Sequence, residues 1–364
     1  MSNVRSIAGL DGVVAAETTL SEVDGEAGRL IVRGKELPEL VGKFGYEGTA
    51  ALLWDGLAEG GGDRDAVQRG MAAGRQRAFA LVPAFLHAAG NLPPVEALRV
   101  ALGLLGDAEP LPHHFLLTGA LPTFLGAILR HHEGKAPLAP NPALTTAADT
   151  LRMITGGRGD GAHEAALDAY LTTIADHGFN ASTFAARVIA STRAGMISAI
   201  IGGLCALKGP LHGGAPGPVL DMLDEIGSEA NIGPWMDKNF QHGERLMGFG
   251  HRIYKVRDPR ADVLKDAVAE LAGNSQRMAF AARVEQGALA ALRKYKPGQR
   301  LDTNVEFYTA LLLEAVGVPR PAFTALFACG RVAGWTAHVL EQEKTGRIIR
   351  PQSRYIGPMP KVAA

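Results

Sequence analysis

TNVEFYTALLLEAVGVP, residues 303–319, carries every signal of a single helix. Thr303 or Asn304 can cap it, because both side chains accept hydrogen bonds from the free amides of a first turn. Alanine and leucine then recur at helical spacing. Gly317, followed by Pro319, ends the pattern in the way that is usual beyond a helix C-terminus. The segment therefore predicts one complete helix.

NASTFAARVIASTRAG, residues 180–195, repeats this signature. Phe184 and Val188 stand four residues apart and share one face of the expected helix. Asn180 or Ser182 can supply the cap. This segment predicts a second helix, with the choice of cap left open.

A third helix is expected over DPRADVLKDAVAELAG, residues 258–273. Asp258 can cap it, and Pro259 occupies the first helical position, where its missing N–H has no cost. The pattern stops at Gly273. Its apolar face consists of Ala261, Leu264, Val268 and Leu271.

The rest of the chain supports one fold class. From Tyr46 onward it is rich in alanine and leucine at helical spacing, broken by glycine and proline. Strand signals nearly vanish after the start, where VVAAETTLSEV and RLIVRG flank the turn DGEAG. The sequence predicts an all-α fold of many packed helices with one minor N-terminal β-hairpin.

Charge and composition exclude several functions. The 364 residues include 37 basic and 37 acidic side chains, so the chain lacks the broad basic field of a nucleic-acid-binding protein. An aromatic content of 6% argues against stacking platforms for single strands. Any anionic ligand must therefore be met by a local cluster of cations.

Cysteine usage and the apolar segments indicate a cytoplasmic protein. Cys205 and Cys329, both in apolar surroundings, form neither a disulfide framework nor a zinc set. The start MSNVRSIAGLDG has no apolar core of a signal peptide. The longest uncharged apolar run, residues 194–207, is too short to span a bilayer and predicts a buried helix.

Three histidines have unusual neighbours. His177, His212 and His251 each lie beside glycine, close to an expected helix start. Each could be a turn histidine bound to backbone, and taken singly that is the more common case. A helix N-terminus favours the neutral imidazole, which can donate a hydrogen bond to a developing oxyanion. Three such histidines in one chain favour a catalytic role.

Glu306 lies in the first turn of the first helix described above. It could simply complement the helix dipole, which is sufficient explanation in most helices. Alternatively it is a general base kept ionised by that dipole.

MGFGHRIYKVRDPRADVLK, residues 247–265, concentrates cations in a neutral chain. Within it, GFGHRI lacks the third glycine of a dinucleotide fingerprint, and no nucleophile elbow occurs anywhere in the sequence. The cations that follow His251 are Arg252, Lys255, Arg257 and Arg260.

Two other arginines stand out. Arg331 lies in the apolar stretch ACGRVAGWTAH, so it is either paired in the core or aimed at an anionic ligand. Arg350 lies in the cationic C-terminal segment RIIRPQSRYIG, where most such side chains are merely solvated. Guanidinium groups that converge would recognise a small dicarboxylate by bidentate pairs.

Taken together, these segments resemble the citrate synthase family, in the shorter form found in many bacteria and archaea. The likeness keeps order and spacing along nearly the whole chain. It is carried by GLDGVVAAETTLSEVDGEAG, RGKELPELV, ADHGFNASTFAARVIAST, KGPLHGGA, MGFGHRIYKVRDPRA, NVEFYTALLLEAVGVP, RVAGWTAHVLEQ and RIIRPQSRYIGP.

The resemblance implies a mostly helical homodimer with its active site in a cleft between two domains. A large domain would comprise residues 1–212 and 319–364, and a small domain residues 213–318. The family condenses acetyl-CoA with oxaloacetate and hydrolyses citryl-CoA to citrate and CoA. No metal or redox cofactor takes part.

The resemblance also implies site residues. His212 would stabilise the enol or enolate of acetyl-CoA, His251 would polarise and protonate the oxaloacetate carbonyl, and Glu306 would remove the methyl proton. Arg350 would enter the site of the partner subunit. Oxaloacetate would be bound by His177, Arg260, Arg331 and Arg350, and CoA by Lys255 and the backbone of Gly248, Phe249 and Gly250.

The chain departs from the family pattern at two positions. Glu306 stands where the family usually has aspartate, in NVDFY, and its extra methylene moves the carboxylate by roughly one bond length. We expect Glu306 to be the working base. Pro216 stands where asparagine often follows HGGA, and proline suits the start of a helix.

Three alternatives remain open from the sequence. A 2-methylcitrate synthase would use propionyl-CoA, and one methylene in an apolar pocket changes the binding free energy by about 1–3 kcal/mol. A non-catalytic CoA- or dicarboxylate-binding relative, disabled by Glu306, would bind ligands without releasing thiol. A metallohydrolase built on the histidines would lose activity to chelators, although the histidine spacings argue against it.

Overall fold

The structure is a computed structural model. It describes residues 8–10, 12–157, 159–212, 216–251, 253–254, 256–272 and 275–360. The predicted helix stop Gly273 and the predicted CoA ligand Lys255 lie outside these ranges.

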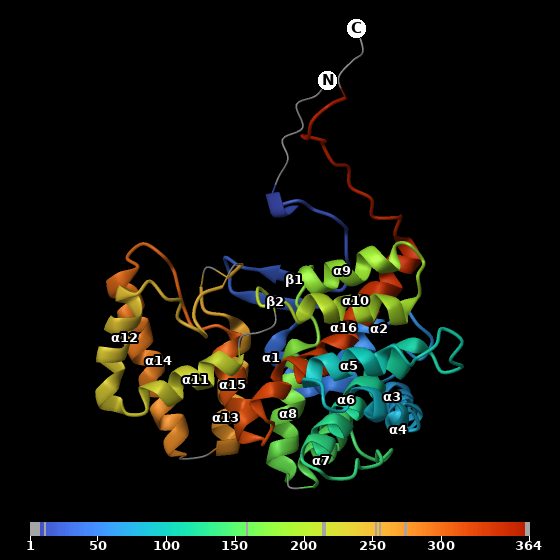
Figure 1. Cartoon of the computed structure of the whole chain (residues 1–364), viewed down its shortest axis with the longest axis horizontal. Helices are drawn as coiled ribbons and strands as arrows, with labels where there is room; N and C mark the ends of the chain where they lie inside the picture. The colour runs from blue at the N-terminus through green and yellow to red at the C-terminus, as the bar shows by residue number, and fades with distance from the viewer. Residues whose placement is uncertain are drawn as a thin grey trace.

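Helices dominate the molecule, and the predicted all-α class is confirmed (Figure 1). The helices are α1 (Leu37–Glu39), α2 (Gly45–Trp54), α3 (Arg64–Phe79), α4 (Val82–Ala89), α5 (Pro94–Leu102), α6 (His113–His132), α7 (Thr146–Thr155), α8 (Gly161–Ile174), α9 (Ala181–Ala190), α10 (Met196–Leu207), α11 (Pro216–Ile226), α12 (Ile232–Gln241), α13 (Pro259–Ala272), α14 (Gln276–Tyr295), α15 (Val305–Ala315) and α16 (Phe323–Thr345). The strands are β1 (Ser21–Asp24), β2 (Arg29–Val32) and β3 (Lys35–Glu36).

The predicted N-terminal hairpin is present. β1 and β2 are antiparallel, and Ser21 pairs with Val32 at the open end. The sequence did not indicate β3, which extends the hairpin into a three-stranded sheet with the order β1-β2-β3. Only two residues form β3, too few to produce an alternating pattern.

The caps that the sequence left open are resolved. The Asn180 side chain accepts hydrogen bonds from the amides of Ser182 and Thr183 and therefore caps α9. Asn304 caps α15 by accepting from the Glu306 amide. The amide of Arg260 donates to Asp258 at 3.0 Å, as predicted for α13. Each cap satisfies an amide that has no partner within its own helix.

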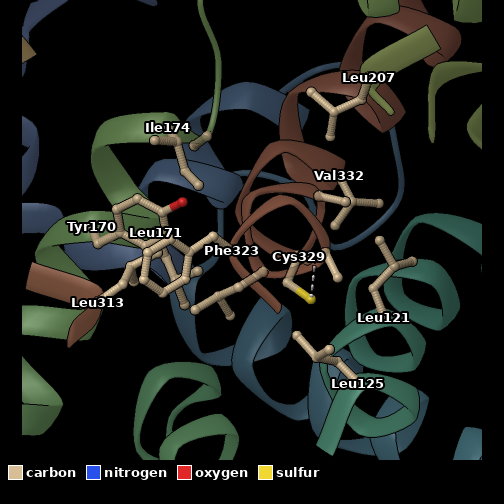
Figure 2. Packing of buried hydrophobic residues seen from close by; sticks show 14 of the residues in the cluster. Leu121, Leu125, Tyr170, Leu171, Ile174, Leu207, Leu313, Phe323, Cys329 and Val332 are labelled. Atoms are coloured by element: carbon tan, nitrogen blue, oxygen red, sulfur yellow. Dashed lines mark hydrogen bonds between the residues drawn. The ribbon is translucent and has the colours of Figure 1, made fainter. Parts of the chain in front are cut away.

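α16 is the central helix of the larger group of helices. It contacts α2, α5, α6, α8, α9 and α10, and its apolar side chains fill the space between them. Figure 2 shows Cys329 and Val332 of α16 among leucines of α6 and the side chains of Tyr170 and Ile174 of α8. The uncharged run over residues 194–207 forms the largely buried α10, as predicted. Cys205 is exposed, contrary to the expectation of apolar surroundings, whereas Cys329 is buried.

α11 to α15 lie together at the left of Figure 1. α13 packs against both α15 and α8, so it links this group to the remaining helices. The domain limits near residues 213 and 318 stay a prediction. Of the helices that the structure describes, none combines the length and the apolar character required to cross a membrane.

Candidate active site

Three histidines from distant parts of the chain gather beside buried arginines. The ring centres of His177 and His251 lie 5.7 Å apart. Nε2 of His177 lies 3.1 Å from the Tyr254 hydroxyl. The charges of Arg260 and Arg331, and the rings of His251 and His212, all act on His177, which is buried. The structure therefore brings the predicted histidines into one cluster.

His251 is held in one tautomer by backbone. Its Nδ1 accepts hydrogen bonds from the amides of Ile253 and Tyr254, both at 3.1 Å. The proton of a neutral ring is consequently assigned to Nε2. Burial, and after it the charge of Arg260, lowers the pKa of His251 to about 4. At neutral pH the ring is uncharged and can donate one hydrogen bond from Nε2.

His212 has the opposite tautomer. Its Nε2 accepts from the Ser182 amide at 3.2 Å and lies 2.8 Å from the Ser182 hydroxyl. The proton of the neutral ring is thereby assigned to Nδ1. Trp335 donates to the same hydroxyl at 3.1 Å, which fixes the serine from α16. Burial, followed by the charge of Arg331, lowers the pKa of His212 to about 4.

The predicted neutral imidazoles are thus present, but their cause differs from the expected one. The sequence pointed to helix dipoles. In the structure, burial is the largest influence on the pKa of His177, His212 and His251, and neighbouring guanidinium groups add to it. Burial and positive neighbours both oppose the charged imidazolium.

Asp258 and Arg260 form a buried pair at the start of α13. Arg260 Nε and Nη2 donate to the two carboxylate oxygens at 3.0 and 2.8 Å. Asp258 also accepts from the amide of Val305 at 3.2 Å, which joins α13 to the start of α15. Nη2 of Arg260 lies 3.3 Å from Nε2 of His251. The pair therefore presents a guanidinium edge beside the histidine.

Arg331 is buried without a carboxylate within 4.0 Å among the residues that the structure describes. Its Nε donates to the carbonyl of Ile174 at 2.6 Å, and its guanidinium lies 4.7 Å from the centre of the Phe327 ring. Burial lowers its pKa to about 10. Of the two predicted roles for Arg331, this environment favours an anionic ligand over a core ion pair.

Glu306 is half-buried in the first turn of α15, close enough to Asp258 and Arg260 to feel both charges. Burial raises its pKa to about 7, the Arg260 charge opposes the rise and Asp258 adds to it. Burial is the largest influence on the pKa of this carboxyl group, and the role of the helix dipole in keeping it ionised stays a prediction. A carboxylate with a pKa near 7 is suited to a general base.

Gly248–Gly250 forms part of the support beneath the site. The Gly250 amide donates to the carbonyl of Asp302 at 2.7 Å. The Asn304 amide donates to Gly248 at 3.0 Å, and its side chain donates to the Gly250 carbonyl at 2.9 Å. Phe249 packs on Phe307, with ring centres 5.4 Å apart. These contacts tie the loop before His251 to the cap of the helix that carries Glu306.

A cavity of about 450 Å³ opens beside His251. Tyr254 and the loop of residues 298–301 line it, together with Glu26 from the turn of the hairpin. The hairpin and the site loops thus border one open hollow next to a predicted catalytic residue.

Not every predicted residue joins the cluster. Arg350 is exposed in the extended segment after α16, and the structure gives it no ion pair among the described residues. Arg257, one of the four cations after His251, binds the protein carboxylates of Glu285, Asp262 and Asp302. Lys255 lies outside the described residues, as noted above.

The sequence named Ser182 only as a possible helix cap, and it did not single out Tyr254 or the ion-pairing role of Asp258. The spacing of Asp258 and Arg260 at a helix start is the one local signal that could have indicated a pair. Nothing in the sequence around Ser182 points to His212, which follows 30 residues later.

In the described part of the chain, no three His, Cys, Asp or Glu side chains are arranged to hold a metal ion. The metallohydrolase alternative therefore has no ligand set there.

A family model described as citrate synthase, C-terminal domain, matches residues 9–352. A citrate synthase of Acidithiobacillus ferridurans is 36% identical, covering 96% of this chain and 95% of the relative. A 2-methylcitrate synthase of Mycobacterium tuberculosis is 32% identical, covering 96% and 90%.

Solved structures agree. The chain is similar to citrate synthase from Thermotoga maritima, with a TM-score of 0.86, 36% identity and coverage of 98% and 97% of the two chains. It is also similar to a ternary complex of carboxymethyl coenzyme A and oxaloacetate with citrate synthase from Thermoplasma acidophilum, with a TM-score of 0.84, 26% identity and coverage of 98% and 97%. Since the likeness runs through both sequence and fold along nearly the entire length, this chain is an enzyme of the citrate synthase family.

Proposed function

We propose that the cluster around His251 binds oxaloacetate and acetyl-CoA, condenses them to citryl-CoA and hydrolyses that thioester to citrate and CoA. One observation carries the assignment of residues. Glu306, whose pKa is about 7, feels the charge of Arg260. The guanidinium group of Arg260 lies beside His251, a neutral imidazole whose proton is assigned to Nε2. A base, a cation and a hydrogen-bond donor are the three groups that the condensation requires.

Oxaloacetate is an anion with two carboxylates and a ketone. Arg260 and Arg331 supply positive charge in a buried environment, and Arg331 has no carboxylate partner among the described residues. His177, neutral and adjacent to the Tyr254 hydroxyl, adds a hydrogen-bonding group. Guanidinium groups bind carboxylates by paired hydrogen bonds, which supports oxaloacetate as their ligand.

The chemistry follows from the two tautomers. Glu306 takes a methyl proton from acetyl-CoA while Nδ1–H of His212 donates to the thioester oxygen, where charge develops. The carbon nucleophile attacks the ketone carbon of oxaloacetate, and Nε2–H of His251 protonates the ketone oxygen. The proton that Glu306 took from the methyl group replaces the one that His251 gave, so both groups return to their starting states. Water then cleaves the thioester and CoA leaves as the thiol. Every electron pair comes from the substrates and water, so the proposed sequence needs no metal or redox cofactor.

CoA binding is proposed at Lys255 and along the backbone of Gly248, Phe249 and Gly250. The two glycines have φ of +83° and +80°, which lets the backbone bend where the ligand approaches. Lys255 follows His251 by four residues and would meet a CoA phosphate.

The proposed assembly is a homodimer in which Arg350 completes the oxaloacetate site of the other subunit. Its support is the exposure of apolar side chains on the segments that carry the two chain ends. Val14 is 85% exposed and Ile356 86% exposed in the single chain, which a partner surface would cover. The cytoplasmic location stays a prediction.

The test is thiol release from acetyl-CoA with and without oxaloacetate. We expect release only with oxaloacetate present, and a Glu306→Gln variant should lose about a hundredfold or more in kcat because the base is gone. Ligand binding without thiol release would point to a non-catalytic relative. Full turnover by the variant would refute Glu306 as the base.

A second candidate, 2-methylcitrate synthase, is favoured by the relative of that name at 32% identity. The two activities differ by one methylene of the acyl group, about 1–3 kcal/mol of binding free energy. Comparing kcat/KM for acetyl-CoA and propionyl-CoA decides between them, and we expect the larger value for acetyl-CoA.

A further inference from the structure

Glu285 of α14 is a buried carboxylate outside the substrate site. It is 5% exposed and accepts hydrogen bonds from four donors. Tyr308 and Thr303 donate from their hydroxyls at 2.6 and 2.7 Å. Arg257 Nη1 and Lys265 Nζ lie at 3.0 and 3.4 Å. Two cations and two hydroxyls thus occupy the full acceptor capacity of one carboxylate.

The donors belong to the two walls of the proposed active site. Arg257 directly precedes Asp258 in the loop that carries His251 and Arg260. Thr303 directly precedes the cap of α15, and Tyr308 lies two residues beyond Glu306. Glu285 therefore touches the loop that would polarise oxaloacetate and the helix that would supply the base.

From this geometry, and resting on the function proposed above, we propose that Glu285 is a positioning residue that holds Glu306 in register with the His251–Arg260 loop. It touches no reacting atom. The two walls also meet through Asp258 and Val305 and through Gly250 and Asp302. Arg257 Nη1 also lies 3.4 Å from Asp302 Oδ1. Glu285 is the contact that binds cations on the loop side, Arg257 and Lys265, and the two hydroxyls on the α15 side.

The charge of Glu285 matters as well as its shape. Burial disfavours the ionised form, but hydrogen bonds from Tyr308, Thr303 and Arg257 outweigh it and keep the pKa below the usual range for glutamate. A glutamine of the same size would keep one acceptor oxygen and turn an N–H₂ group toward donors. At least one of the four contacts would be lost, and Arg257 would lose its buried counter-ion.

Misalignment of Glu306 should slow one step of the reaction, the removal of the methyl proton. The loop can still bind oxaloacetate, but the carboxylate of Glu306 is displaced from the methyl group. A misplacement of about 1 Å costs on the order of a hundredfold in rate. Proton removal then becomes the slowest step, which an isotope on the methyl group detects.

The experiment compares acetyl-CoA with its trideuteromethyl form in the full-length enzyme. Glu285→Gln should lower kcat by about 10- to 100-fold, leave the KM for oxaloacetate within about threefold, and raise the isotope effect on kcat above the wild-type value. Tyr308→Phe removes one donor and should change both quantities in the same direction by a smaller amount. If Glu285→Gln does not fold, Tyr308→Phe alone decides the question.

Glu314→Gln is the matched control. Glu314 also lies on α15 and binds Arg277 at 3.0 Å and Arg320 at 3.5 Å, away from Glu306. We expect wild-type kcat and isotope effect from it. Three outcomes overturn the proposal: unchanged kinetics in the variants that fold, a lower kcat with an unchanged isotope effect, or the same change in Glu314→Gln. The proposed function is tested separately, by thiol release from the wild type and by its loss in Glu306→Gln.

Discussion

At the scale of single residues, Glu306 is an acid whose surroundings work against its charge. Burial raises its pKa to about 7, although Arg260 opposes the rise. A base must be ionised to accept a proton, so kcat/KM for oxaloacetate should rise about tenfold per pH unit below pH 7 and level off above it. A pH–rate profile between pH 5.5 and 8.5 measures this. A profile flat across pH 7 would contradict the role of Glu306.

The Ser182 amide fixes the tautomer of His212, and the Ser182 hydroxyl, which donates to Asn180 at 2.8 Å, lies against the same ring nitrogen. Ser182→Ala keeps the amide but removes the hydroxyl, so His212 can swing. We expect kcat to fall by roughly tenfold or more with little change in the KM for oxaloacetate. The variant also leaves Trp335 without its acceptor, at a cost of about 1–3 kcal/mol in the free energy of unfolding. Trp335→Phe removes the N–H that fixes the serine, so it should lower kcat in the same direction by a smaller amount. An unchanged kcat in Ser182→Ala would show that the hydroxyl has no part in placing His212.

At the scale of secondary-structure elements, the turn of the N-terminal hairpin packs closely against the loop after His251. A Cβ added at Gly25 would run into the Ile253 carbonyl oxygen, and one at Gly28 would lie 2.6 Å from Val256 Cγ2. Gly25→Ala must therefore shift the hairpin or the loop, and we expect kcat/KM to fall about tenfold or more.

Gly34→Ala is the control for the hairpin, since φ is +79° there and nothing lies within 4 Å of the added Cβ. That variant should lose about 1–2 kcal/mol of stability through backbone strain and keep its kinetics. Steady-state kinetics and thermal unfolding of both variants check the prediction. Equal kinetics in the two would show that the hairpin contact has no part in shaping the site.

The elements also show what a sequence can reveal. The caps Asn304 and Asp258 bind amides two residues away, so helix starts were predictable from local pattern. Trp335 and Ser182 are 153 residues apart, and Glu285 lies 28 residues from Arg257. Such contacts form only when helices pack, and no periodicity records them. The histidines could be predicted from their glycine neighbours and from the order of motifs shared with the family. The residues that hold these histidines in place have no such local pattern.

At the scale of the whole molecule, a buried polar chain leads from the site to the C-terminal segment. Asp176 directly precedes His177 in the sequence and lies 3.2 Å from His338. His338 in turn lies 3.0 Å from Arg187. Arg187 donates to Gln342, whose amide donates to the Arg347 carbonyl at 3.0 Å. The extended segment after α16 is therefore held to the helices at Arg347 and leaves them on the same side as the N-terminal segment (Figure 1).

This anchoring makes the proposed exchange of Arg350 between subunits testable by mixing. Arg350→Ala and Glu306→Gln homodimers should each be nearly inactive. In a mixed dimer, the subunit with intact Glu306 would receive intact Arg350 from its partner, so one of the two sites works. Random mixing at equal amounts makes half of the dimers mixed, and roughly a quarter of wild-type activity should return. Thiol release after co-refolding the two variants measures it, with light scattering to confirm dimers. If Arg350 served its own subunit, every site in the mixture would lack one of the two groups, and no activity would return.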